Sequence, residues 1–170
     1  MPQIKLLMVY IIDASALFDL KRWYPMNMEF FKPIWKKLDS MTKNGELIAP
    51  YEVLREVERG DDEIKRWCQE HRNMFIEIDE EQINNFKIVR DKYDPTYWRN
   101  NMGLEAWADP WVISLALSFE IIGESGKKGK PTIVTSENKT KPNRIPTIAK
   151  QFGIISLNVP EFLKEIGVEK

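Results

Sequence analysis

The chain has 170 residues, of which 43% are hydrophobic and 30% are charged, a composition typical of a soluble globular domain and unlike that of disordered or membrane chains. The 25 basic and 26 acidic side chains nearly cancel, so there is no overall positive field of the kind that attracts nucleic acid, and a polyanion would need a local basic patch. The single cysteine, Cys68, excludes an internal disulfide and a cysteine-built zinc site, which fits a reducing cytoplasm. We expect one domain spanning residues 1–170.

The stretch LLMVYII at residues 6–12, followed by small residues, superficially resembles a signal peptide. The apolar run is too short to span a bilayer, and Asp13 interrupts it before the small residues. We therefore expect a cytoplasmic protein with no membrane segment.

Short apolar runs alternate with longer helical patterns along the chain. Strands are predicted at residues 7–12, 46–49, 74–78, 132–135 and 154–157. Helices are predicted at 29–43, 51–59, 61–72, 79–93, 104–120, about 145–152 and 160–166, with irregular connections at 94–103 and 123–132. The first and fourth strands lack strict alternation, which is typical of strands buried on both faces of a parallel sheet. This pattern predicts an α/β fold with right-handed crossovers.

Acidic side chains recur where the predicted strands end. Asp13 directly follows the first strand in MVYIIDASALF, and ligands of parallel sheets bind beyond the carboxyl ends of the strands. After the second strand, Glu52 and Glu56 lie four residues apart on one face of a helix, so either could face the same edge. Thr135 and Glu137 close the fourth strand. The pattern predicts several carboxylates at one edge of the sheet.

A further acid, Asp109, precedes the helix in WADPWVISLAL. Pro110 suits the first helical position and Asp109 suits the N-cap, which would fix its carboxylate at a helix N-terminus. Each acid has an alternative interpretation, because Asp13 and Asp109 suit plain helix caps and Glu56 suits a solvated surface. The joint occurrence of the four acids favours a shared site.

Clustered carboxylates require a cation. Two carboxylates ~4 Å apart repel by about 1 kcal/mol in bulk water and about 4 kcal/mol at an effective dielectric constant of 20. Oxygen ligands without histidine or cysteine select hard ions, so we expect Mg²⁺ or Mn²⁺. Such a site hydrolyses phosphodiesters with a metal-activated water, and a second ion can stabilise the leaving oxygen.

The stretches IIDASAL, ADPWVISLA and IVTSE, the glutamate after strand two and FGI before the last strand together resemble the PIN-domain family of metal-dependent ribonucleases. This family includes the VapC-type toxins of toxin–antitoxin pairs. The resemblance covers nearly the whole chain and implies a three-layer α/β/α sandwich with a central, mostly parallel sheet. Glu137 stands where the family more usually has Asp. Trp107 and Trp111 make the ADPWV neighbourhood more similar to a less studied PIN-like branch.

The resemblance also implies roles for individual residues. The implied acidic metal cluster consists of Asp13, Glu56, Asp109 and Glu137. The implied hydroxyl partners, which orient ligands or metal-bound water, are Ser15 and Thr135. PIN-like proteins are often dimers, so a homodimer is a further expectation.

Two stretches offer local positive charge for RNA. One contains Lys127, Lys128, Lys130, Lys139, Lys141 and Arg144; the other contains Arg90, Lys92 and Arg99 interleaved with Tyr93, Tyr97 and Trp98. Basic residues follow phosphates and aromatic faces stack on unpaired bases, so single-stranded or loop RNA is the expected substrate. Alternatively, the lysines only aid solubility, and Tyr97 and Trp98 cover the core.

The resulting hypothesis is a Mg²⁺- or Mn²⁺-dependent endoribonuclease, the toxin of a toxin–antitoxin pair with an antitoxin protein as partner. A noncatalytic PIN-fold module that binds protein or RNA is the main alternative. A metal-dependent phosphatase or phosphoacceptor domain is less favoured, because Ser15 stands where such proteins carry a second aspartate after Asp13.

Overall fold

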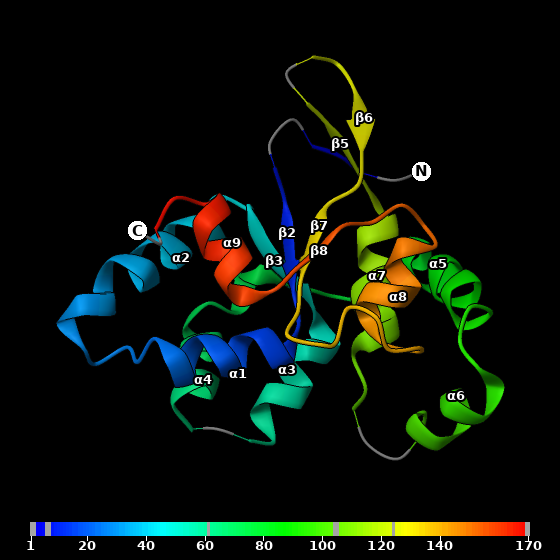
Figure 1. The fold of residues 1–170 in the computed structure, drawn as a ribbon, viewed down its shortest axis with the longest axis horizontal. Coiled ribbons are helices and arrows are strands. Elements are labelled where there is room, and N and C mark those ends of the chain that lie inside the picture. The colour runs from blue at the N-terminus through cyan, green and yellow to red at the C-terminus, as the bar shows by residue number, and fades with distance from the viewer. Residues whose placement is uncertain (1–2, 6–7, 61, 104–105, 124, 169–170) are drawn as a thin grey trace.

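In the computed structural model, residues 3–5, 8–60, 62–103, 106–123 and 125–168 are described. Five parallel strands form the central sheet in the order β4-β3-β2-β7-β8 (Figure 1). Their bounds are β2 Tyr10–Ile12, β3 Leu47–Pro50, β4 Phe75–Ile76, β7 Thr132–Val134 and β8 Ser156–Leu157. In register, Tyr10 lies opposite Leu47 on one side and Thr132 on the other. Strand β2 is therefore central, and its carboxyl end lies between those of β3 and β7.

Helices cover both faces of this sheet (Figure 1). On one side lie α1 Ala14–Trp23, α2 Lys32–Lys43, α3 Tyr51–Glu58, α4 Asp62–Glu70 and α9 Val159–Glu165, with short 3₁₀ turns at Glu29–Phe31 and Arg72–Met74. On the other side lie α5 Glu80–Arg90, α7 Asp109–Leu117 and α8 Ile145–Lys150, and α6 Pro95–Asn101 lies at the periphery. The predicted three-layer α/β/α architecture is confirmed. None of the described helices is long and apolar enough to cross a membrane.

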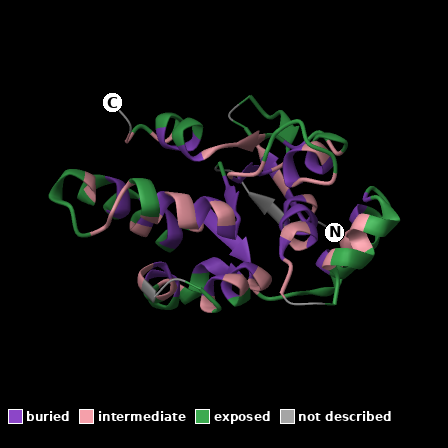
Figure 2. Ribbon diagram, turned by 60° about the horizontal axis from the view of Figure 1, so that its bottom comes forward, coloured by how far each residue is buried: buried purple, intermediate pink, exposed green. Residues whose placement is uncertain are grey.

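Helix α7 lies against the face of the central sheet and is largely buried. It packs against β2, β3 and β7 and is flanked by α5 and α8. Val112, Ile113, Leu115 and Ala116 are all buried. Figure 2 shows the same for the central strands, and every residue of β2, β3 and β7 is buried. Because its sides are covered, α7 holds its first residue, Asp109, in a fixed position against the sheet.

A second, small sheet was not predicted. It joins β1 Gln3–Lys5 in parallel with β5 Phe119–Ile122, and β5 in antiparallel with β6 Lys128–Gly129. The predicted helix 104–120 is thus wrong at both ends, because residues 106–108 are not helical and α7 ends at Leu117; residues 104–105 lie outside the described residues. The β-branched residues of FEII form a strand with alternating burial instead.

Two helices were also missed. Residues 14–23 form α1, in which Ala16, Leu17 and Leu20 face the core and Asp13 is the N-cap. Residues 95–101, predicted to be irregular, form α6, which begins with Pro95 after an Asp94 cap whose carboxylate accepts a hydrogen bond from the Tyr97 N–H at 2.9 Å. Cap chemistry therefore sets the start of both helices.

The end of α7 depends on a lysine that the sequence analysis considered for phosphate binding. The Lys130 Nζ donates to the carbonyl oxygens of Leu117 and Phe119 at 3.2 and 3.1 Å. A cation at a helix C-terminus satisfies free carbonyls and interacts favourably with the helix dipole. Lys130 thus stabilises the transition from α7 to β5.

We predict that Lys130→Met lowers the free energy of unfolding by about 1 kcal/mol, because two carbonyl groups lose a charged donor. Chemical denaturation measures the change. Lys127→Met, at an exposed lysine of the same loop, is the matched control and should change stability by less than about 0.5 kcal/mol. Equal effects of the two substitutions would contradict this role of Lys130.

Candidate active site

The site is centred on Asp13, which directly follows β2 and is 4% exposed. Its carboxylate accepts hydrogen bonds from the Ala16 N–H at 2.9 Å, the Ser15 hydroxyl at 2.8 Å and the Thr135 hydroxyl at 2.6 Å. The first of these bonds makes Asp13 the N-cap of α1. Asp13 therefore combines the cap role with a position at the carboxyl edge of the sheet.

Hydroxyl groups join the ends of β2 and β7 around Asp13. The Ser15 and Thr135 hydroxyl oxygens lie 3.3 Å apart, and the Ser15 hydroxyl oxygen also accepts the Ser136 N–H at 3.0 Å. The backbone N–H of Asp13 donates to the Val134 carbonyl at 3.1 Å, which continues the strand pairing. Ser15 and Thr135 thus fix the orientation of the Asp13 carboxylate.

Asp109 reaches the same place from the opposite layer. It is the first residue of α7, and the N-cap is Ala108, so the expected cap role of Asp109 is wrong by one residue. Burial raises the pKa of the Asp109 carboxyl well above its ordinary value, and the charges of Glu137, Asp13 and Glu56, together with a hydrogen bond to Glu137, raise it further. The other three predicted acids therefore lie within electrostatic reach of Asp109.

The two glutamates are each held by a backbone N–H. Glu137 accepts from the Ile145 N–H at 2.7 Å, and Glu56 accepts from the Ala108 N–H. Burial is the main cause that raises the pKa of Glu56, and the Glu137 charge adds to it. Glu52 instead pairs with Arg55 at 3.0 Å. Of the two candidates on α3, Glu52 and Glu56, Glu56 is therefore the one that lies beside the other acids.

The donor set of this cluster is chemically suited to a hard divalent cation. It offers only oxygen atoms, and the mutual repulsion that raises the Asp109 pKa is what a cation would relieve. Among the described residues, no three His, Cys, Asp or Glu side chains are arranged to hold a metal ion. The acids are gathered, but their carboxylates would have to turn toward a common centre to coordinate one.

An aromatic cluster adjoins the acids. Tyr93 packs against Tyr97, Trp98 and Trp107, with ring centroids 5.4 to 6.2 Å apart. Tyr93 is buried, and its hydroxyl has no hydrogen-bond partner within the described part of the chain. Burial raises the pKa of Tyr93, and the charges of Asp109 and Glu137 raise it further. The buried hydroxyl of Tyr93 near the acids was not foreseen, because no sequence pattern marks it.

The predicted RNA-binding stretches are largely engaged within the protein. Lys128 pairs with Glu120 at 3.6 Å, and Lys139 pairs with Glu161. Tyr97 and Trp98 are partly buried against the core, as the alternative interpretation held. Arg144 is engaged as well, because its guanidinium lies 5.2 Å from the centre of the Tyr97 ring and donates to the Tyr97 hydroxyl. Arg144 directly precedes Ile145, whose N–H donates to Glu137, so its positive charge lies beside the segment that binds this acid.

The Asp13 carboxyl predicts a distinctive pH dependence of stability. Burial raises its pKa from 3.8 to about 7, so between these values the folded state binds a proton more tightly than the unfolded state. The unfolding free energy of the metal-free protein should therefore fall as pH rises from about 4 to about 7, by up to about 4 kcal/mol. Denaturant titrations at several pH values in EDTA measure this dependence.

Asp13→Asn removes one titrating group and should make the profile less steep across this range, and the remaining slope comes from Asp109 and Glu56, whose pKa values are also raised. Asp91→Asn, at a side chain that is 73% exposed, should leave the profile unchanged. Parallel profiles for wild type and Asp13→Asn would contradict the raised pKa.

Comparison with known proteins gives a family and two distant structural likenesses. A search of curated proteins finds no match. The crystal structure of PAE2754 from Pyrobaculum aerophilum is 18% identical, with a TM-score of 0.46, and the match covers 95% of this chain and 91% of that one. The crystal structure of VapBC2 from Rickettsia felis, bound to a DNA fragment from their promoter, is 15% identical, with a TM-score of 0.43 and coverage of 89% and 98%.

Both likenesses are too distant to bear on the activity of this chain. A family model gives the one assignment, because it matches residues 10–169 and so includes the whole central sheet and all four acids. The chain belongs to the family of the domain of unknown function DUF4411.

Proposed function

We propose that this protein is a Mg²⁺- or Mn²⁺-dependent endoribonuclease of the PIN type that hydrolyses phosphodiester bonds of unpaired RNA. The observation that carries the proposal is the approach of Asp13, Glu56 and Glu137 to Asp109, each from a different segment of the chain. Gathering four acids around one buried carboxylate is unfavourable for folding alone, so their presence at the ligand-binding edge of a parallel sheet favours a catalytic role.

The four acids would differ in their roles as metal ligands, because they are held in different ways. Asp13 is fixed by two hydroxyls and one N–H, so it would be a rigid ligand, and Asp109 is fixed by the buried helix α7. Glu56 and Glu137 each have one carboxylate oxygen bound to a backbone N–H, and the hydrogen bond between Glu137 and Asp109 would give way to a shared cation. When bound, the divalent ion would lower the pKa of a water molecule and neutralise charge on the scissile phosphate.

The toxin role, an antitoxin partner and a homodimer follow from the resemblance to PIN-domain toxins alone. They remain proposals of this hypothesis. Co-expression with a small protein encoded beside this one, followed by co-purification, tests the partner: a stable complex that suppresses cleavage supports the toxin role, and an unaffected activity contradicts it.

Substitution of the acids tests the catalytic role. We predict that Asp13→Asn and Asp109→Asn each reduce Mn²⁺-dependent cleavage of single-stranded RNA at least 100-fold, because each removes a charged ligand (about 2.7 kcal/mol or more). Glu52→Gln, on the same helix as Glu56 but paired with Arg55, is the matched control and should cleave at close to the wild-type rate. Cleavage by Asp109→Asn at the normal rate would refute the assignment.

Metal binding has a separate readout in thermal stability. Millimolar Mn²⁺ should raise the melting temperature of the wild type, because a ligand that binds only the folded state stabilises it, by about 2.7 kcal/mol at 100 times its Kd. The shift should be much smaller for Asp109→Asn and unchanged for Glu52→Gln. A wild-type melting temperature that no divalent ion alters would count against the metal site.

One observation favours the noncatalytic alternative. Within the described residues, no three acids are arranged to hold a metal ion, and Glu56 and Glu137 are each already bound to a backbone N–H. A PIN-fold module that only binds protein or RNA would show this arrangement permanently. Metal-dependent cleavage by the purified protein, lost in Asp13→Asn, would exclude this alternative.

A further inference from the structure

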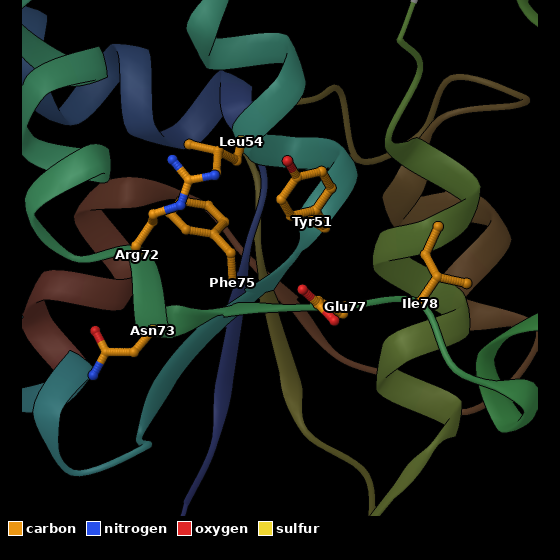
Figure 3. A pocket seen from close by; sticks show the side chains of 7 residues that line it. All are labelled: Tyr51, Leu54, Arg72, Asn73, Phe75, Glu77 and Ile78. Carbon is orange, nitrogen blue, oxygen red and sulfur yellow. The ribbon is translucent and has the colours of Figure 1, made fainter.

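A pocket of about 520 Å³ lies at the outer edge of the sheet, beside β4. Its lining residues are Tyr51, Leu54, Arg72, Asn73, Phe75, Glu77 and Ile78. Leu54 and Phe75 are buried and give it an apolar floor, whereas Arg72 and Glu77 are exposed at its rim. In Figure 3 the Tyr51 ring stands on one side of the hollow, and the Arg72 guanidinium and the Phe75 ring stand on the other, with Glu77 below.

Part of the pocket lining lies at the carboxyl ends of the strands, as the acids do. Tyr51 follows β3 and Glu77 follows β4, just as Asp13 follows β2. Neighbouring strands lie about 4.8 Å apart, so the pocket begins about one strand spacing from Asp13 and extends to about two. Helix α3 links the two places, because it carries Tyr51 at its start and Glu56 in the acid cluster. A ligand that reaches both places needs to span only about 5–10 Å.

The chemistry of the lining suits a single unpaired nucleotide. The Tyr51 ring offers a face for base stacking above the apolar floor, and a guanidinium binds phosphate or stacks on a base. Arg72 makes no salt bridge to another described residue, so its charge is available to a phosphate. The Glu77 carboxylate accepts hydrogen bonds and does not donate them, which favours a base that presents N–H groups, and guanine presents both a ring N–H and an amino group on one edge.

We propose that this pocket binds the base of an RNA nucleotide that flanks the bond cleaved at the acid cluster, with guanine preferred. Tyr51 stacks on the base, Arg72 contacts its phosphate and Glu77 accepts from its edge. The assignment to RNA rests on the proposed nuclease function, whereas the pocket itself binds a nucleotide independently of cleavage. Arg72, Tyr51 and Glu77 are thus specificity residues and take no part in the chemistry of hydrolysis.

Titration of the metal-free, ¹⁵N-labelled protein with 5′-GMP tests the pocket without any cleavage. We expect amide signals of residues 72–78 and of Tyr51 to shift at millimolar GMP, and 5′-UMP to bind more weakly because uracil has no amino group. Arg72→Gln, at an exposed residue, should weaken GMP binding several-fold, and Tyr51→Ala should weaken it about fivefold or more. Arg22→Gln removes the same charge at a side chain that is 71% exposed on α1, and should bind GMP as the wild type does.

Cleavage kinetics link the pocket to the proposed substrate. Arg72→Gln should raise the KM for single-stranded RNA several-fold and leave kcat within about twofold, since the pocket binds and does not catalyse. The proposal is overturned if GMP shifts no pocket signal, or if Arg72→Gln binds GMP and cleaves RNA as Arg22→Gln does; the pocket would then be free for a peptide paired with the edge of β4. GMP binding in a protein that cleaves no RNA would refute the nuclease assignment and leave the nucleotide pocket standing.

Discussion

The buried carboxylate of Asp13 is the constraint on which the rest of the site depends. A charge at that depth is unfavourable, and the protein offsets it with an N–H of the helix that Asp13 caps and with the hydroxyls of Ser15 and Thr135. These bonds join the carboxyl ends of β2 and β7, so the position of the acid and the pairing of the two central strands support each other. The site is thus built into the fold and not added to it on flexible loops.

The other acids surround this centre from both layers of helices. Helix α3 presents Glu56 from one side of the sheet, while α7 presents Asp109 from the other. Hydrogen bonds connect these layers near the site, because the Ala108 N–H, just before Asp109, donates to Glu56, and the Arg59 guanidinium donates to the Ala106 carbonyl. The raised pKa values of Asp13, Glu56 and Asp109 have burial as their main cause, and repulsion among the acids adds to it. A bound cation would offset that repulsion. The same geometry that is unfavourable in the metal-free protein would then favour the metal-bound protein.

The parts of this arrangement that follow from local pattern were predictable. Buried apolar runs located all five central strands, and the rule that ligands bind at the carboxyl ends of parallel strands placed Asp13 and Glu137 at one edge. The N-cap of α7 was misplaced by one residue, since Ala108 and not Asp109 is the cap, and the helix predicted at 104–120 was too long at both ends. The β5–β6 ribbon was missed because its pairing joins Ile121 to Gly129 and Ile122 to Lys128, which no local periodicity reveals.

Features that depend on contacts between side chains far apart in the sequence were harder to predict. Glu56 and not Glu52 lies beside the other acids, because Glu52 pairs with Arg55 and Glu56 accepts from the Ala108 N–H. Lys130 is not available to bind phosphate, because it donates to carbonyl groups at the end of α7. The nucleotide pocket joins residues of α3 with the edge strand β4, which lie about twenty residues apart in sequence and carry no motif. Only the three-dimensional arrangement reveals these contacts.

The most direct test of the central claim is the anomalous scattering of manganese in crystals of the wild-type protein grown with Mn²⁺. The account predicts a peak bonded to carboxylate oxygens of Asp13 and Asp109 at about 2.0–2.3 Å, with Glu56 or Glu137 turned toward it. No manganese peak among these four acids, in crystals grown at millimolar Mn²⁺, would contradict the claim that they form a metal centre.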